Sequence, residues 1–403
     1  MGIEIDPGMP CSLNFRVEKS IQDCGLDQWE HVTKQSPLFM RAPFLQAFEE
    51  ALPDTLQLRY GVLGDKEGPV AVLAGQILTL QANRIASADN SRPKILQSVM
   101  AKLHARVFMW GNFMGWGYSG IAFAPGVDKE VLWPNIAEAI DRAQEEDDGI
   151  RSAGIQLVLD ISAAEAAGAR HLEEHRFRPL PSEPDMILTI EPDWKSFDDY
   201  RTALKAKYRK ASIEMDKQLA GAGCVVEKLS DVETHADELI NLHLQVHEQS
   251  VNRFVTLKRD FIPALARRLG DRFICTVIRQ ESRILGFITT LIDGDTALAY
   301  VVGHDVQANR ELPIYLRLLQ TAIEDGIRHG CKRVTYGRTA LEPKARIGAV
   351  AVPLTIYGRH KNAIIGSLIT PFLQQMAPKN GPPLRSPFKE YSTLPVETAQ
   401  KQD

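Results

Sequence analysis

One stretch, residues 272–337, narrows the fold more than any other part of the sequence. Apolar, β-branched runs between 272 and 303 are interrupted by turn residues at Gln280–Ser282 and at Asp293–Gly294, which predicts three antiparallel strands. LPIYLRLLQTAIEDGIRHG (312–330) has its apolar residues at helical spacing and ends on a glycine, which predicts a helix. KRVTYGR then returns to a strand pattern. This order predicts an α/β (mixed α+β) domain with a mostly antiparallel, twisted sheet flanked by helices.

The first half of the chain has the same order of predicted elements. LQLRYGVLG (56–64) predicts a strand, a stretch rich in glycine and aromatic residues follows at 110–125, and 128–148 predicts a helix before a buried strand at 154–161. A chain of 403 residues has room for two or three domains at roughly 150 residues each. The repeated order predicts two domains and a loose, proline-rich tail, with boundaries at 1–192, 193–376 and 377–403.

The overall charge excludes a protein whose whole surface attracts nucleic acid or membranes, because the net charge is −4 and the pI is about 6.2. Any site for an anion must therefore be local. The 5 cysteines include no CxxC pair, which is typical of a reducing compartment. No apolar window reaches the about 18 residues of a membrane span. We therefore expect a cytoplasmic protein without a membrane span or a secretory signal.

GRTALEPKARIGAVAVPLTIYGRHKN (337–362) sets fixed cations on both sides of an apolar run. Its first three cations follow the strand that comes after the 312–330 helix. They should therefore emerge at the same sheet edge as the loop that precedes this helix. We expect these cations, Arg338, Lys344 and Arg346, to contact a phosphate or a carboxylate of a substrate.

The last two cations of this stretch, Arg359 and Lys361, follow an apolar run at 347–357. If the run is one straight strand, its about eleven residues span some 30 Å, roughly 3.3 Å per residue. The five cations then do not form one site. We expect Arg359 and Lys361 to form a solvated strand end.

A second basic segment, DWKSFDDYRTALKAKYRKASIEMDKQL (193–219), predicts a helix that begins at Ser196 with aspartates in its first turn. A solvated helix face explains its cations without a ligand, whereas contact with an anionic substrate would use Lys207 and Arg209. RNA binding is the weaker alternative, because aromatic side chains that could stack on bases are sparse here. The cations of the helix are Lys205, Lys207, Arg209, Lys210 and Lys217.

The order of elements in 272–337 resembles that of the GNAT acyltransferase superfamily. SFDDY followed by cations, and the spacing from Gly337 to Lys344, resemble FemAB-like proteins of that superfamily. This likeness covers roughly residues 15–370. One departure is the loop Gln307–Pro313, which lacks the glycines that a GNAT loop carries around a pyrophosphate. A second departure is Ile347, which separates the arginine and the glycine that are adjacent in the FemAB-like pattern.

The resemblance implies two GNAT-like domains and transfer of an acyl group from acyl-CoA to a small-molecule amine bound in the cleft between them. Acyl-CoA would be a co-substrate, and no metal is implied. A backbone N–H near Tyr300 would polarise the donor carbonyl, and such a donor is worth about 3 kcal/mol. The residues implied for the cofactor are Val302, Gly303, Gln307, Arg310, Leu312 and Tyr315.

Aminolysis of a thioester needs a base for the amine and a proton for the leaving thiolate. Our candidates for the base are His304 and Glu248, and our candidate for the proton donor is the phenol of Tyr336. Spacing alone does not single out any of them. Further candidates are His247 for the base and Tyr315 and Tyr357 for the phenol.

Two further motifs have both a functional and an ordinary interpretation. His243 and His247 lie four apart on a predicted helix, which suits a metal pair, but no third ligand accompanies them. We expect a half-exposed helix face there and no metal. GNFMGWGYSG (111–120) either lines an acceptor groove with Trp116 and Tyr118, or forms a buried strand that needs glycine for close packing.

Two other functions stay open. One is a FemX-like, aminoacyl-tRNA-dependent ligase that acts on a cell-wall precursor. In the FemAB-like proteins that this chain resembles, the tRNA-dependent members carry a long helical arm in the second domain. The helices predicted between 196 and 335 are too short for such an arm. The resemblance therefore favours acyl-CoA over tRNA as the donor. The other is a catalytically degenerate binding protein, because the glycine-free loop at 307–313 does not favour a pyrophosphate.

Overall fold

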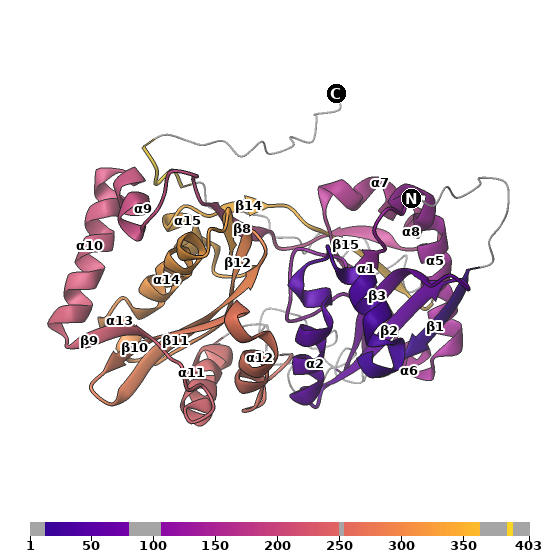
Figure 1. The fold of residues 1–403 in the computed structure, drawn as a ribbon, viewed down its shortest axis with the longest axis horizontal. Helices are drawn as coiled ribbons and strands as arrows, with labels where there is room; N and C mark the ends of the chain where they lie inside the picture. Colours follow the sequence, from indigo (N-terminus) through magenta and orange to yellow (C-terminus); the bar gives the residue numbers. More distant parts are fainter. Residues whose placement is uncertain (1–12, 80–105, 250–253, 363–384, 390–403) are drawn as a thin grey trace, which may run out of the picture. The chain divides into compact units, whose positions relative to one another are not determined.

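The computed structural model describes residues 13–79, 106–249, 254–362 and 385–389. These residues form two compact units, each built on its own sheet (Figure 1). Of the described residues, the first unit comprises 13–79, 106–183, 247–249, 254–270 and 353–362, and the second comprises 184–246, 271–352 and 385–389.

The first unit contains a sheet of eight described strands with helices packed against it. The strands are β1 (Asn14–Glu18), β2 (Leu56–Gly64), β3 (Pro69–Thr79), β4 (Arg106–Trp110), β5 (Ile121–Phe123), β6 (Ile155–Ile161), β7 (Arg178–Pro181) and β15 (Thr355–His360). The helices are α1 (Leu26–Thr33), α2 (Ala42–Glu50), α5 (Lys129–Glu146), α6 (Asp148–Ser152), α7 (Ala166–Ala169), α8 (His171–Glu174) and α12 (Phe261–Leu269). Short 3-10 turns are η1 (Ile21–Cys24), η2 (Leu38–Met40) and η3 (Ala163–Glu165).

The second unit contains a sheet of seven described strands. The strands are β8 (Asp185–Thr189), β9 (Cys224–Lys228), β10 (Phe273–Gln280), β11 (Arg283–Asp293), β12 (Thr296–His304), β13 (Arg333–Thr335) and β14 (Val350–Val352). The helices are α9 (Phe197–Ala203), α10 (Ala206–Gly221), α11 (Ala236–Gln249), α13 (Ala308–Glu311), α14 (Ile314–Arg328) and α15 (Leu341–Arg346), with the 3-10 turn η4 (Gly270–Arg272) before β10.

The two sheets share one plan. The first has the order β1-β2-β3-β4-β6-β15-β7, and the second, read from its other end, has the order β9-β10-β11-β12-β13-β8-β14. Among the described strands, each sheet has a single parallel pair, β4 with β6 and β12 with β13. The strand beside that pair comes from the other half of the chain, β15 in the first sheet and β8 in the second.

This exchange of strands explains how the units differ from the predicted domains. β8 lies before the predicted boundary at 192/193, yet it pairs with β13 and β14 of the second sheet. β15 lies far beyond that boundary, yet it pairs with β6 and β7 of the first sheet. A boundary placed from the order of elements along the chain does not detect strands that cross between sheets.

Helices cover both faces of the second sheet, and glycine makes room for each. A Cβ added to Gly286 of β11 would lie 2.6 Å from the Ile314 side chain of α14. A Cβ added to Gly303 of β12 would lie 2.5 Å from the backbone nitrogen of His243 on α11. Figure 1 shows α14 and α11 on opposite sides of these strands.

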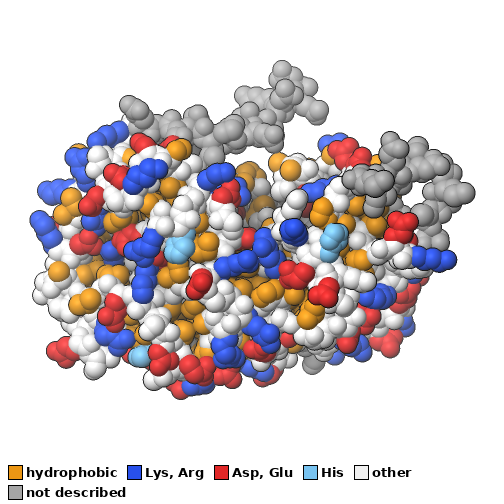
Figure 2. All heavy atoms as spheres, viewed as in Figure 1, with side chains coloured by type: hydrophobic (Ala, Val, Ile, Leu, Met, Phe, Trp, Pro, Cys, Tyr) orange, Lys and Arg blue, Asp and Glu red, His pale blue; other side chains and the backbone are white. Residues whose placement is uncertain are grey.

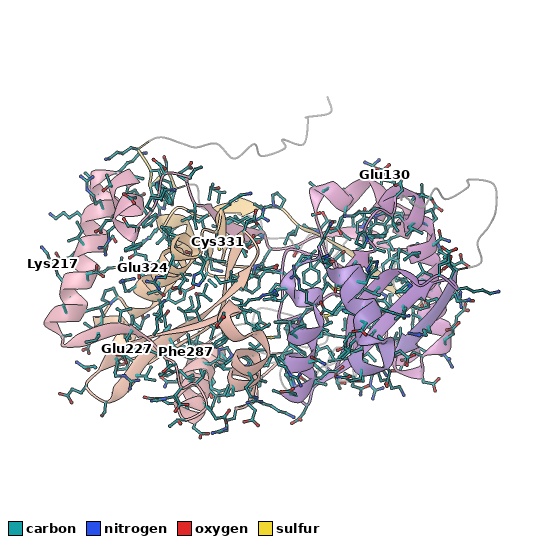
Figure 3. All side chains as sticks on the ribbon, in the orientation of Figure 1. Glu130, Lys217, Glu227, Phe287, Glu324 and Cys331 are labelled. Atoms are coloured by element: carbon teal, nitrogen blue, oxygen red, sulfur yellow. The ribbon has the colours of Figure 1, made fainter. Side chains whose placement is uncertain are left out.

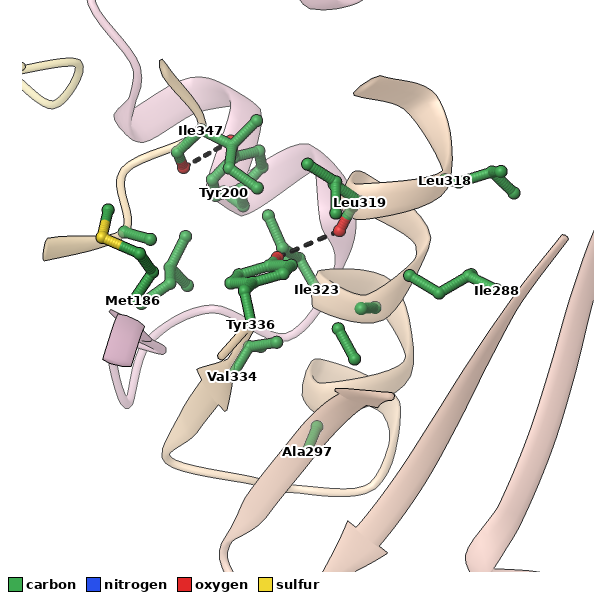
Figure 4. Packing of buried hydrophobic residues seen from close by; sticks show 14 of the residues in the cluster. Met186, Tyr200, Ile288, Ala297, Leu318, Leu319, Ile323, Val334, Tyr336 and Ile347 are labelled. Atoms are coloured by element: carbon green, nitrogen blue, oxygen red, sulfur yellow. Dashed lines mark hydrogen bonds between the residues drawn. The ribbon is translucent and has the colours of Figure 1, made fainter. Parts of the chain in front are cut away.

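The core of this unit lies between α14 and the sheet, and two phenols complete it (Figure 4). Tyr200 of α9 donates to the Ile347 carbonyl at 2.9 Å, and Tyr336, just after β13, donates to the Leu319 carbonyl of α14 at 3.0 Å. Both side chains are buried, so each bond satisfies a polar group that has left water.

The local predictions for 272–337 are confirmed. β10, β11 and β12 pair antiparallel, with positive φ at Glu281 and Gly294 in the two predicted turns, and α14 falls within the predicted 312–330 helix. The 196–223 helix is instead broken into α9 and α10. The break occurs because Leu204 is extended and bridges to Phe388.

Two predictions about the C-terminal quarter are wrong. The run 347–357 is not one strand, because β14 and β15 are separate and belong to different sheets. Part of the tail predicted to be loose is packed: Phe388 lies against Trp194 and Tyr200, and Lys389 N–H donates to the Ala203 carbonyl at 3.0 Å. The sequence also predicts an amphipathic helix at 362–376, and this segment falls outside the described residues apart from Asn362.

The close approach of α11 to β12 gives the first testable prediction. We expect Gly303→Ala to lower the free energy of unfolding by about 1–3 kcal/mol, because the added methyl group would meet helix backbone, which cannot rotate away. Urea denaturation measures this change. Gly221→Ala at the end of α10 is the control: nothing lies within 4 Å of its Cβ, so stability should hold or rise. Equal effects of the two changes would contradict this packing.

Candidate functional site

The second sheet has an internal strand edge that, among the described strands, none covers along part of its length. β12 pairs with β13 only through Thr296–Leu298. On its other side β12 remains paired with β11 as far as His304. Residues 299–304 therefore present backbone N–H and C=O groups toward the side that β13 has left. Such groups must find other partners, and a substrate can be one of them.

His243 of α11 reaches this open edge. Its Nδ1 lies 3.0 Å from the Val302 carbonyl oxygen, which can only accept, so Nδ1 carries the proton of this bond. In the neutral imidazole the lone pair is then on Nε2, which makes Nε2 the basic nitrogen. In the sequence, His243 stands out only as half of a possible metal pair with His247. No local signal reveals its role, which depends on α11 packing against Gly303.

His304 and Tyr315 lie together at the end of the open edge. Their ring centroids are 5.8 Å apart, and His304 is only 9% exposed. Burial lowers the pKa of His304 and raises the pKa of Tyr315 to about 12. Three residues predicted to bind the cofactor, Val302, Gly303 and Tyr315, thus lie with the candidate base His304 on β12 and the start of α14.

The loop 307–313, predicted to receive a pyrophosphate, is occupied by the chain itself. It contains α13, whose first N–H, that of Ala308, donates to Asp305 Oδ1 at 2.8 Å. Asn309 Oδ1 accepts the N–H of Tyr315 at 2.8 Å, and Pro313 stands at the N-cap of α14. The backbone donors that a phosphate needs at a helix start are therefore largely used. The remaining predicted contacts are exposed in the case of Gln307 and Arg310 and half-buried in the case of Leu312.

The other catalytic candidates are not gathered at the open edge. The Tyr336 hydroxyl is committed to the Leu319 carbonyl, and burial raises its pKa well above the usual value, so it does not face a substrate. Glu248 is exposed near the end of α11, and His247 lies 3.4 Å from the Thr256 hydroxyl. Tyr357 belongs to β15 of the first sheet.

The three cations expected to bind an anion have different environments. Arg346 is exposed and pairs with Glu342 at 3.2 Å, whereas Arg338 is half-buried. Lys344 is only 4% exposed, and its ammonium group donates to backbone carbonyls rather than facing solvent. A buried lysine in such a position stabilises the backbone. Contact of these cations with a phosphate or a carboxylate stays a prediction.

Arg359 also differs from the expected solvated strand end. It is 7% exposed and lies over the Phe177 ring of the first unit. Its guanidinium group pairs with Asp141 and donates to Gln156 Oε1 at 2.8 Å. A buried guanidinium needs such a set of acceptors, and β15 carries Arg359 into a sheet that provides them. Lys361, just beyond β15, is exposed as expected.

The cations of α10 lie mainly on its solvent side. Lys207 is exposed and Arg209 is half-buried. Lys217 extends outward from the helix in Figure 3. Figure 2 shows positive and negative side chains interspersed over the visible face, with apolar ones between them. The cations of α10 remain candidates for contact with an anion, without forming a groove of their own.

Trp116 and Tyr118 are part of an aromatic group in the first unit. Tyr118 stacks on Phe39 with ring centroids 5.5 Å apart, and Trp116 meets the same ring edge-on at 5.6 Å. Tyr118 is buried and Trp116 is half-buried. Their role in acceptor binding remains a prediction.

Neither a membrane-spanning helix nor a cluster of metal-ligand side chains is found in the part of the chain that the structure describes. No described helix is long and apolar enough to span a bilayer. Within the same residues, no three His, Cys, Asp or Glu side chains converge as metal ligands would.

Comparison with known proteins identifies the fold and one domain within the chain. Residues 206–344 match the model of the acetyltransferase (GNAT) domain. This range includes β12, β13, His243 and the loop before α14. No curated protein matches the chain in sequence.

Solved structures share the fold at low sequence identity. FemX is 10% identical over 85% of this chain and 98% of its own, with a TM-score of 0.53. A conserved protein of unknown function from Bacteroides thetaiotaomicron is 13% identical over 86% of this chain and 99% of its own, with a TM-score of 0.50. Residues 206–344 thus match a GNAT acetyltransferase domain, and the chain has a mixed α+β fold that it shares with FemX.

Proposed function

We propose that this protein transfers an acyl group from acyl-CoA to the amino group of a small molecule, and that the reaction takes place at the open edge of β12. The observation that carries the proposal is the divergence of β12 from β13 after Leu298, with a histidine from α11 on the exposed edge. An open strand edge supplies fixed backbone dipoles for an acyl group, and the imidazole supplies a base beside them.

The residues of the edge account for each step of the transfer. The Nε2 atom of His243 removes a proton from the amine as its nitrogen attacks the thioester carbonyl. A backbone N–H of residues 299–304 stabilises the negative charge that develops on the carbonyl oxygen. The C–N bond forms, the C–S bond breaks, and the proton held by His243 passes to the leaving thiolate. The products are an amide and free CoA, and His243 returns to its neutral form.

The phosphates of the donor would be bound by side chains rather than by the backbone of the loop. Most N–H groups between Asp305 and Arg317 already have acceptors within the chain. Arg310 is exposed beside this loop and is our candidate for a phosphate contact. Acyl-CoA is favoured over aminoacyl-tRNA because the helices described between residues 196 and 335, such as α11 and α14, do not form a long arm.

Replacing His243 tests the proposed base. We expect His243→Asn to lower kcat by about 10²–10⁴-fold while leaving stability nearly unchanged, because the asparagine amide can still donate to Val302 but cannot accept the proton. Release of free thiol from acetyl-CoA with a panel of amines measures the rate. The control is His360→Gln, a histidine of the first sheet, which should keep the wild-type rate. Full activity of the asparagine variant would remove His243 from the mechanism.

The donor can be identified by direct binding. We expect calorimetry to detect acetyl-CoA or a longer acyl-CoA at micromolar to millimolar concentration, and Arg310→Gln to weaken this binding about tenfold. Filter binding with bulk tRNA is the competing arm. Tight tRNA binding that falls steeply with salt, with no binding of any acyl-CoA, would instead favour the aminoacyl-tRNA-dependent ligase. Binding of neither donor would favour the degenerate binding protein.

Burial of His304 predicts how stability depends on pH. Its pKa is lowered in the folded protein, whereas the unfolded chain binds a proton near the ordinary value of about 6.5. Below that pH the unfolded state binds more protons, so the free energy of unfolding should fall by up to about 1.4 kcal/mol per pH unit from this residue. Urea denaturation of wild type and His304→Gln between pH 5 and pH 7.5 measures the difference. A difference that does not change with pH would contradict the argument.

A further inference from the structure

The segment after β13, residues 336–340, begins where β13 has left β12, stays hydrogen-bonded to Met186 of β8 through Tyr336 and Gly337, and has a strained conformation. Gly337, Thr339 and Ala340 all have positive φ, at 66°, 62° and 43°. Glycine adopts this region freely, but for a β-branched residue such as Thr339 it is a costly exception. Two non-glycine residues in this region persist only where surrounding contacts determine the conformation strongly.

Two buried charges of opposite sign supply those contacts. Asp185, at the start of β8 and 4% exposed, accepts the Thr335 hydroxyl at 2.6 Å and the Gly337 N–H at 3.0 Å. Lys344, also 4% exposed, donates to the carbonyl oxygens of Tyr336, Gly337 and Arg338 at 2.7, 3.1 and 2.5 Å. The carboxylate holds the N–H side of this segment and the ammonium group holds its carbonyl side. We call this pair the backbone clamp.

The backbone clamp does not itself provide a ligand site. An ammonium group has three N–H donors, and three carbonyl oxygens of the segment match them. The ammonium group of Lys344 therefore bonds to the backbone of this segment. Arg338 lies at the centre of the clamped segment, is half-buried, and carries a guanidinium group suited to two-point binding of a carboxylate or phosphate. The bond from Lys344 to the Arg338 carbonyl fixes the backbone from which the Arg338 side chain extends.

We infer that Lys344 and Asp185 are positioning residues, and that their clamp sets the segment 336–340 so that Arg338 binds the anionic group of a substrate at the open edge of β12. This role rests on the proposed function, because it assigns Arg338 to the same reaction. The anion is a phosphate if it belongs to the donor and a carboxylate if it belongs to the acceptor. The inference separates the three cations that the sequence groups together: Arg338 binds, Lys344 positions, and Arg346 does neither.

The clamp itself can be tested without any activity. We expect Lys344→Met to speed hydrogen–deuterium exchange of the peptide covering 336–340 at least tenfold. Thr335→Val, which removes one bond to Asp185 and disturbs folding less, should speed it by a smaller factor. Lys217→Met, which removes an exposed lysine from α10, is the matched control and should leave this exchange unchanged. Unchanged exchange in Lys344→Met would overturn the inference.

The connection to Arg338 is tested by a double-mutant cycle. We expect Arg338→Gln and Lys344→Met each to raise one Michaelis constant about tenfold with kcat less affected, and the double variant to be no worse than Arg338→Gln alone. A raised constant for acyl-CoA identifies a phosphate of the donor, and a raised constant for the amine identifies a carboxylate of the acceptor. A merely structural lysine would lower stability and change neither constant, and effects that multiply in the double variant would also overturn the inference.

The two proposals fail in different ways. If the wild-type protein transferred no acyl group from any donor, the proposed function would fail and Arg338 would lose its assigned substrate. The exchange experiment would still decide whether Lys344 holds the 336–340 backbone. If transfer occurred but Arg338→Gln left both Michaelis constants unchanged, the proposed function would stand and the inference would be overturned.

Discussion

The second unit depends on one constraint: a strand in the interior of a sheet loses its neighbour partway along its length. Beyond Leu298, β12 has backbone donors and acceptors on the side that β13 has left. These groups need partners as much as any others in the core. His243 provides one of them from α11, and Gly303 allows the helix backbone close enough for that bond. The chemistry proposed for this protein uses the same opening, so the fold and the reaction depend on the same divergence of two strands.

The end of β13 imposes a second constraint, because the chain turns there before α15. β13 ends after Thr335, and the chain must turn sharply to begin α15 six residues later. The turn is made with left-handed residues, which are stable here because Asp185 and Lys344 bond both sides of the backbone. Asp185 comes from β8, a strand contributed from before the predicted domain boundary. The exchanged strand therefore does more than extend the sheet, since it also supplies the carboxylate that fixes the segment after β13.

The sequence predicted those features that local pattern determines. Alternation and turn residues located β10, β11 and β12, and helical spacing located α14, because strand and helix periods are readable within a dozen residues. The exchange of β8 and β15 was not readable, since pairing partners lie more than a hundred residues away. The same limit applied at the site. Val302, Gly303 and His304 could be placed on a strand from the local pattern, whereas the role that we propose for His243 depends on the packing of α11.

Charged residues show most clearly why chemistry cannot be read from residue type alone. Five cations between 337 and 362 looked alike in sequence, yet burial divides them. The side chains of Lys344 and Arg359 are almost inaccessible to solvent. Lys344 donates to backbone carbonyls, and Arg359 bonds to Asp141 and Gln156. Desolvating a cation without such acceptors is prohibitive, so a buried cation surrounded by protein acceptors is ill suited to exchange them for a substrate. Arg338 differs from these two cations because its side chain is only partly buried. Its backbone carbonyl is bonded to Lys344, so the side chain extends from a fixed point of the backbone and can still reach a ligand.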